Sequence, residues 1–157
     1  MGTGAAPAWR AAAISLAVAV VGLLWIHAAT LRSMIRIWTA NDSFAHCWFV
    51  APLSLYMIWR NRGRLATVTP RASALGLAVI AAFGGMWFLG TIASIQLIQQ
   101  LCLIGMVLGA VLAVLGRHAV RLILFPLAIL FLAVPLGEGL FPILMSVAGR
   151  LAVMALQ

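Results

Sequence analysis

His46 and Cys47 are adjacent in the sequence and are the side chains best suited to nucleophilic chemistry. A cysteine becomes a nucleophile when a nearby base or cation favours its thiolate. Adjacent residues on a helix, however, point about 100° apart, and catalytic pairs usually meet through folding. Cys102 lies between two leucines and is expected to be a small buried apolar residue. We therefore assign no catalytic role to either cysteine.

Chemistry that needs paired carboxylates or a metal finds little support. The only acidic residues are Asp42 and Glu138, which are far apart in sequence, so only folding could bring them together. The two cysteines have no CxxC spacing and predict neither a disulfide framework nor a metal site. We expect no cofactor.

The composition is that of an integral membrane protein. Hydrophobic residues make up 66% of the chain and charged residues only 8%, whereas soluble domains carry about 25% charged residues. In a soluble protein the net charge of +8 would suggest nucleic-acid binding. Here the arginines separate apolar segments, so they indicate membrane topology and contact with anionic lipids. We expect membrane lipids as partners and no nucleic acid.

The apolar segments predict an all-α, polytopic helical membrane protein with a single membrane domain over residues 1–157. A spanning helix needs about 20 mostly apolar residues. This gives about six transmembrane segments, the last of which can be incomplete: residues 11–30, 43–59, 72–90, 95–115, 119–134 and 143–157. The alternative for the first segment is a cleaved signal peptide, but such an apolar region is usually only about 7–15 residues long.

Residues 31–42, between the first two predicted spans, suit a short helix in the membrane interface. Arg32 and Arg36 are one turn apart, while Met34, Ile35, Ile37 and Trp38 can face lipid. A plain loop fits nearly as well.

Arginines predict the orientation of the chain. Only Arg32 and Arg36 fall on one side of the predicted layout, and Arg150 falls within the last segment. Since cytoplasmic loops are enriched in arginine, the other side is expected to be cytoplasmic, together with the N-terminus. The arginines on that side are Arg10, Arg60, Arg62, Arg64, Arg71, Arg117 and Arg121.

Several polar and small residues have helical spacing that predicts helix packing. Three glutamines form one polar face, and structural bonding to neighbouring helices is favoured over lining a substrate cleft. They are Gln96, Gln99 and Gln100. A face of small residues that permits close approach is formed by Gly105, Gly109 and Ala113. Expected interfacial anchors are Trp25, Trp48, Trp59 and Trp87.

Two features of the predicted outer face can border a site. His46 is either functional, as ionisable groups at membrane depth tend to be, or an interfacial histidine wetted by lipid headgroups. Pro126 and Pro135 interrupt an apolar segment, and the break near Glu138 must be buried in protein or face water. An ordinary helix-loop-helix turn with a glycine-rich tip is the alternative.

Two sequence blocks carry a resemblance to a known family. Residues 46–65, HCWFVAPLSLYMIWRNRGRL, resemble the H-G-F-L-V-P-x-x-x-Y-x-x-W-R-x-R-x-x-L block of the exosortase/archaeosortase family. Residues 125–138, FPLAILFLAVPLGE, resemble its F-P-L-x-F-L-x-x-x-V-P-x-x-E block. The resemblance covers roughly residues 40–157, and Cys47 departs from it because the family usually has glycine there.

The resemblance implies a bacterial inner-membrane cysteine peptidase or transpeptidase. Such enzymes process substrate proteins with a C-terminal sorting tail: a Pro-Glu-Pro-type motif, an apolar helix and a basic end. Their proposed nucleophile lies in an Ala-Cys-Ser-Gly-like motif, followed by an arginine and a histidine. None of these can be placed here, so the chain looks like the N-terminal half of an exosortase and is expected to be inactive alone. The family-motif positions expected near the outer-face cleft are His46, Pro135 and Glu138.

The alternative from another functional class is a small non-enzymatic multipass membrane protein, either an assembly partner or a transporter-like element. Transporters often contain repeated halves and intramembrane charges. We find no internal repeat and only Arg150 at depth, so the exosortase interpretation is favoured.

Overall fold

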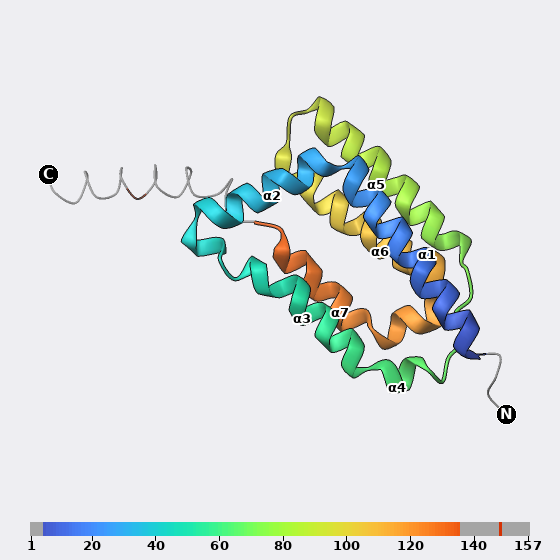
Figure 1. Ribbon diagram of the computed structural model, residues 1–157. Helices are drawn as coiled ribbons and strands as arrows, with labels where there is room; N and C mark the ends of the chain where they lie inside the picture. Colours follow the sequence, from blue (N-terminus) through green and yellow to red (C-terminus); the bar gives the residue numbers. More distant parts are fainter. Residues whose placement is uncertain (1–4, 136–147, 149–157) are drawn as a thin grey trace, which may run out of the picture.

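The computed structural model describes residues 5–135 and residue 148, and the part it describes consists of helices and the turns that join them (Figure 1). The all-α prediction is therefore confirmed. Glu138 and almost all of the predicted span 143–157 lie outside the described residues. The elements are α1 (Ala5–Ile26), α2 (Ala28–Ala40), η1 (Asp42–Phe44), α3 (Cys47–Arg60), α4 (Arg62–Leu65), α5 (Ala74–Ile92), α6 (Gln96–Leu122), α7 (Leu124–Ile129) and η2 (Leu130–Ala133).

Three helices in the described part are long and apolar enough to cross a membrane. They cover Ala8–Ile26 within α1, Ala74–Ile92 and Gln96–Leu122. Helix α3 has only 14 residues, which corresponds to about 21 Å, and the α7–η2 segment is shorter still. The total of about six spans therefore stays a prediction.

Helices α5 and α6 form a hairpin in which glycines allow close contact. A Cβ added to Gly105 would lie 2.5 Å from the Phe83 ring, and one added to Gly109 would lie 2.8 Å from Ile80. A Cβ on Gly76 would overlap the backbone of Ala113. The predicted small-residue face on α6 is thus confirmed, and α5 contributes glycine to the same interface.

The helical backbone of α6 is interrupted by a kink at Gly116, which has a φ of 79°. The left-handed backbone favours glycine, and a side chain here would also collide with the carbonyl of Arg71. The preceding connection runs alongside, with the Ser73 N–H bonded to the Ala113 carbonyl at 2.9 Å. The continuous part of α6 therefore agrees with the predicted span 95–115.

The region after α1 corrects one expectation. Helix α1 ends at Ile26, before the predicted limit at residue 30, because the chain bends at His27 and continues as α2. Most of residues 31–42 belong to helix α2, so the short helix predicted there is confirmed and the alternative of a plain loop is wrong. Met34 and Ile37 do not face lipid as predicted but are buried, since their side of α2 packs against the protein interior.

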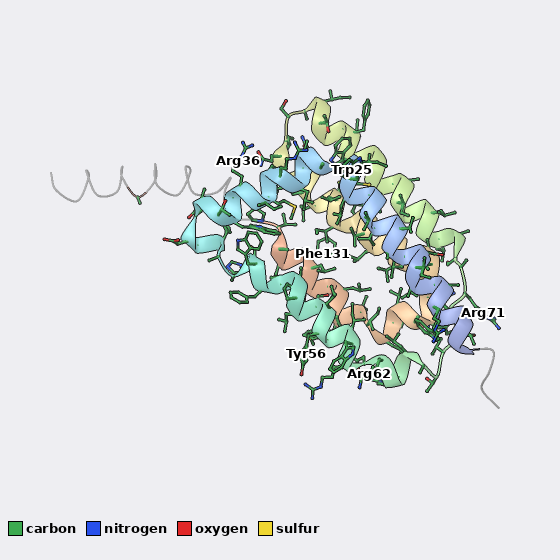
Figure 2. All side chains as sticks on the ribbon, viewed as in Figure 1. Trp25, Arg36, Tyr56, Arg62, Arg71 and Phe131 are labelled. Atoms are coloured by element: carbon green, nitrogen blue, oxygen red, sulfur yellow. The ribbon has the colours of Figure 1, made fainter. Side chains whose placement is uncertain are left out.

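Arginines gather at one end of the bundle, which we call the basic end. The start of α1, the α3–α4 region and the start of α5 lie there (Figure 1). The Gly116 break lies there too, because it packs against the backbone of Arg71 just before α5. The Trp9 indole N–H, in α1, donates to the Val68 carbonyl at 3.1 Å and ties two of these segments together. The opposite end, which we call the Asp42 end, holds η1 and the α5–α6 turn. Figure 2 shows Arg36 far from Arg62 and Arg71.

Gly76→Ala should destabilise the fold by about 1–3 kcal/mol, because its new Cβ overlaps backbone that cannot rotate away. The matched control is Gly85→Ala on the same helix, where a Cβ meets nothing within 4 Å. Thermal unfolding in detergent should show a lower midpoint for Gly76→Ala and an unchanged or slightly higher one for Gly85→Ala. Equal midpoints for the two variants would refute the close α5–α6 contact.

Candidate functional site

The structure places His46 and Pro135 in the same region, at the Asp42 end. His46 is exposed just before α3, and Pro135 is buried just after η2. Contacts between α3 and η2 join these two neighbourhoods. The third predicted position, Glu138, is outside the described residues, so its place relative to the other two stays a prediction.

His46 and Cys47 do approach each other, although the helical spacing argued against it. The Cys47 Sγ lies 3.7 Å from His46 Nε2, while His46 Nδ1 is 3.1 Å from the Ser43 carbonyl. His46 precedes the first residue of α3, so its side chain can lie across the start of the helix. The thiol, however, is completely buried and also lies 3.6 Å from the Leu132 carbonyl, to which it donates. Buried cysteines of this kind are structural and inert.

The end of η2 depends on donors from distant parts of the chain. Val134 is extended, as residues before proline prefer, so the last turn of η2 leaves carbonyls without helical partners. The Trp38 indole N–H donates to the Ala133 carbonyl at 3.0 Å, and the Cys47 thiol donates to Leu132. The part of the proline break up to Pro135 is thus buried in protein and its carbonyls have donors, as hydrocarbon surroundings require. The segment around Glu138 lies outside the described residues.

A second proline break is satisfied in the same way. The chain turns at Ile123, so Pro126 lies in the first turn of α7, where its missing N–H costs little. Farther along, the N–H of Leu130 does not reach the Pro126 carbonyl and bonds to residues nearer in sequence. The buried Ser54 hydroxyl donates to the Pro126 carbonyl instead, at 2.8 Å. Together with the contact at Leu132, this bond fixes α3 antiparallel to the α7–η2 segment.

Polar side chains between α2, α5 and α6 form a buried network. Gln100 is 1% exposed and donates to the Ser33 hydroxyl at 3.2 Å, and Ser33 donates to the Thr30 carbonyl at 2.7 Å. The Trp87 indole N–H donates to the Thr30 hydroxyl at 3.0 Å. Its ring meets His27 edge-on, with 4.6 Å between centroids.

These contacts bear on the roles predicted for the glutamine and tryptophan side chains. The structural role predicted for the glutamines is confirmed for Gln100 and for Gln99, which donates to the Gly90 carbonyl at 3.3 Å. Trp87, also a predicted interfacial anchor, is half-buried, and its indole N–H bonds to Thr30 of α2. Trp25 and Trp59 are largely exposed, as anchors should be.

Trp38 is a residue of this site whose contacts its sequence context does not predict. The amphipathic pattern of residues 31–42 allows Trp38 to face lipid, but its indole joins α2 to the end of η2 across 95 positions of sequence. Its ring also packs edge-on against Trp48, with 5.6 Å between centroids. The sequence contains one chemical indication of this contact. An indole N–H in hydrocarbon needs an acceptor, and a helix broken before Pro135 supplies free carbonyls.

Over residues 5–135, the fold and the site define an all-helical membrane protein with three candidate spanning helices and a proline break held by distant side chains. The chain belongs to the transmembrane exosortase family, whose sequence model matches residues 38–157. The match begins at Trp38 and includes both resembling blocks. No curated protein and no solved structure matches the chain.

Replacing Trp38 with Phe should lower stability by about 1–3 kcal/mol, because the buried Ala133 carbonyl loses its donor. Hydrogen exchange should increase in residues 130–135 more than in α5. The control is Trp25→Phe, since Trp25 is 82% exposed and the substitution should leave both measurements unchanged. Unchanged exchange in Trp38→Phe would show that the indole does not hold the end of η2.

Proposed function

We propose that this chain is the N-terminal membrane part of an exosortase-like cysteine peptidase or transpeptidase that processes proteins with C-terminal sorting tails. The family match over residues 38–157 carries the proposal. The buried contacts support it, because they bring the two resembling blocks together: Ser54 and Cys47 from the first bond to Pro126 and Leu132 of the second.

The proposed orientation places the N-terminus and the basic end in the cytoplasm of a bacterium, with six spans in the inner membrane. The excess of arginine at that end supports it. The second span is proposed to include η1 and the turn before α3. From Asp42 to Arg60 the chain is helical or turned over about 28 Å, close to the thickness of the hydrocarbon core.

A sorting tail complements this arrangement. Its apolar helix would cross the membrane beside the protein, its basic end would lie in the cytoplasm, and its Pro-Glu-Pro motif would reach the Asp42 end. No catalytic role is proposed for any residue of this chain. Cys47 replaces the family's usual glycine, and its thiol is occupied by a structural bond. We therefore propose that these 157 residues alone bind a tail without cleaving it.

The orientation predicts opposite labelling of two exposed positions in a Cys47→Ser, Cys102→Ala background. Ser43→Cys should react with a membrane-impermeant maleimide in intact spheroplasts, whereas Gly63→Cys should react only after lysis. Neither substitution removes an arginine, so the charge balance that sets topology is unchanged. Labelling of Gly63→Cys in intact spheroplasts would reverse the proposed orientation.

A tagged sorting-tail protein should be captured but not cut. A photo-crosslinking residue in place of Leu132, whose side chain is 58% exposed at the Asp42 end, should capture the tail. The same probe at Leu75, equally exposed at the start of α5, should capture it less near the Pro-Glu-Pro motif. Electrophoresis and mass spectrometry of the adducts would locate both crosslinks.

The matched control is a substrate whose Pro-Glu-Pro motif is replaced by alanines. Equal capture of both substrates would contradict tail recognition and favour a non-enzymatic membrane protein. Cleavage by the isolated chain that disappears in Cys47→Ala would contradict the proposed absence of catalysis.

A further inference from the structure

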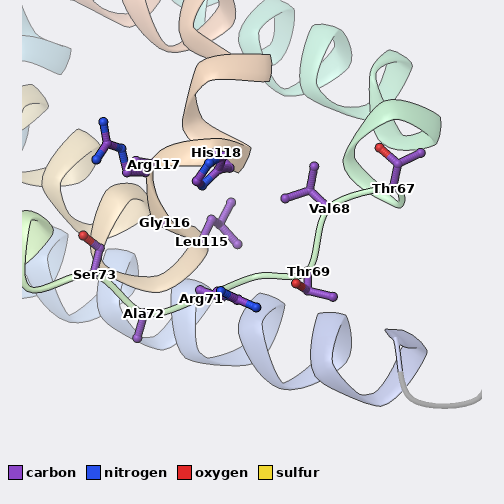
Figure 3. Close-up of a pocket in the computed structure, with 10 residues that line it drawn as sticks. All are labelled: Thr67, Val68, Thr69, Arg71, Ala72, Ser73, Leu115, Gly116, Arg117 and His118. Carbon is purple, nitrogen blue, oxygen red and sulfur yellow. The ribbon is translucent and has the colours of Figure 1, made fainter.

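A cavity of about 500 Å³ with several basic and hydroxyl side chains in its lining lies at the basic end, between the connection into α5 and the break in α6 (Figure 3). Its lining includes Thr69, Arg71, Ser73, Gly116, Arg117 and His118. In Figure 3, Arg71 extends along the connection towards Thr69, and His118 faces Val68 from the α6 side. The exosortase assignment gives this cavity no role, because the resembling blocks bond to each other elsewhere.

Backbone contacts hold the two walls of the cavity in place. The N–H of Arg71 bonds to the Leu115 carbonyl at 3.4 Å, next to the left-handed Gly116. On the other side, Trp9 holds the Val68 carbonyl at 3.1 Å. The cavity is therefore formed by the folded chain and does not depend on a flexible loop closing around a ligand.

The lining is suited to an anion. Arg71, Arg117 and His118 are exposed, and among the described residues no acidic side chain lines the cavity. Arginine guanidinium groups match the oxygen spacing of phosphate, and the hydroxyls of Thr69 and Ser73 can add donors. The Thr67 hydroxyl is already used, because it donates to the Arg64 carbonyl at 2.7 Å.

The depth of the cavity matches the position of lipid phosphates. The apolar part of α1 begins at Ala8, α5 begins at Ala74, and the regular part of α6 ends before Gly116. Side chains at this level therefore lie where a spanning helix leaves the hydrocarbon core and meets the headgroups. Basic pockets between helices at this level bind anionic headgroups.

We propose that this cavity binds a phosphate group, carried by an anionic phospholipid headgroup or free in solution, with Arg71 and His118 on opposite walls and Arg117 as a further positive charge of the lining. The position of the cavity at the ends of the helices and the positive charges of its lining support this site. It does not depend on peptidase function, so it stands or falls separately from the sorting-tail proposal.

The test measures binding to the purified full chain. One arm measures retained phosphatidylglycerol by native mass spectrometry after exchange from mixed phosphatidylglycerol and phosphatidylcholine nanodiscs. The other arm titrates inorganic phosphate into lipid-free protein in neutral detergent by calorimetry. Binding of the lipid alone assigns the phosphate to a headgroup, and binding of inorganic phosphate alone assigns it to solution; either result supports a phosphate site.

The decisive comparison is between a double variant that loses two positive charges inside the cavity and one that loses two positive charges outside it. Arg71→Gln with Arg117→Gln should weaken binding about tenfold, since each basic residue near an anionic surface contributes substantially. Arg60→Gln with Arg64→Gln removes the same charge from the same end, outside the lining, and should change binding less than about twofold. Circular dichroism and size-exclusion elution should match the wild type.

A second variant keeps every charge. Thr69→Trp places an indole in the cavity, and it should weaken binding to a similar extent by occupying the volume. Equal losses in the two double variants would reduce the effect to general surface charge and overturn the proposal. Unchanged binding in both Thr69→Trp and the cavity double variant would overturn it as well.

Discussion

The arrangement of this protein depends on pairing backbone carbonyls wherever a helix is broken within apolar surroundings. An unpaired carbonyl in hydrocarbon costs several kcal/mol, roughly the effect of losing a core side chain. The donors come from distant segments: Ser54 for the break at Pro126, and Trp38 and Cys47 for the end of η2. Each break therefore creates a tertiary contact, and the helices are positioned by their interruptions as much as by their apolar faces.

The α5–α6 hairpin provides the complementary, unbroken part of the scaffold. In lipid, apolar side chains gain little by leaving the solvent, so helices associate through close packing and polar contacts. Glycines at Gly76, Gly105 and Gly109 bring the two backbones together, and the Gly90 carbonyl accepts from Gln99 across the turn. The polar network through Gln100 then joins this hairpin to α2, so α2 holds Trp38 at the height of the η2 terminus.

The long helices were predictable because their length and apolar composition are local properties. The limits of α5 and the regular part of α6 fall within a few residues of the predicted spans, and glycine spacing identified the face where they meet. The pairing of donors with broken helices was not predictable, since nothing local links Trp38 to Ala133. The same limit explains Met34: its apolar character predicts burial or lipid contact equally well, and only the packed fold distinguishes them.

The two ends of the bundle consequently differ in chemistry. At the Asp42 end the donors of Trp38 and Cys47 are used to complete backbone bonding, so neither group is free for other contacts. At the basic end the backbone contacts of Arg71 are separate from its guanidinium, which stays exposed. Positive charge at a helix end favours one orientation during insertion wherever the arginines lie in the loop. The cavity exists only where the backbone of Arg71 lies against the Gly116 break. Folding therefore gives defined positions to positive charges that the sequence already concentrates at this end of the helices.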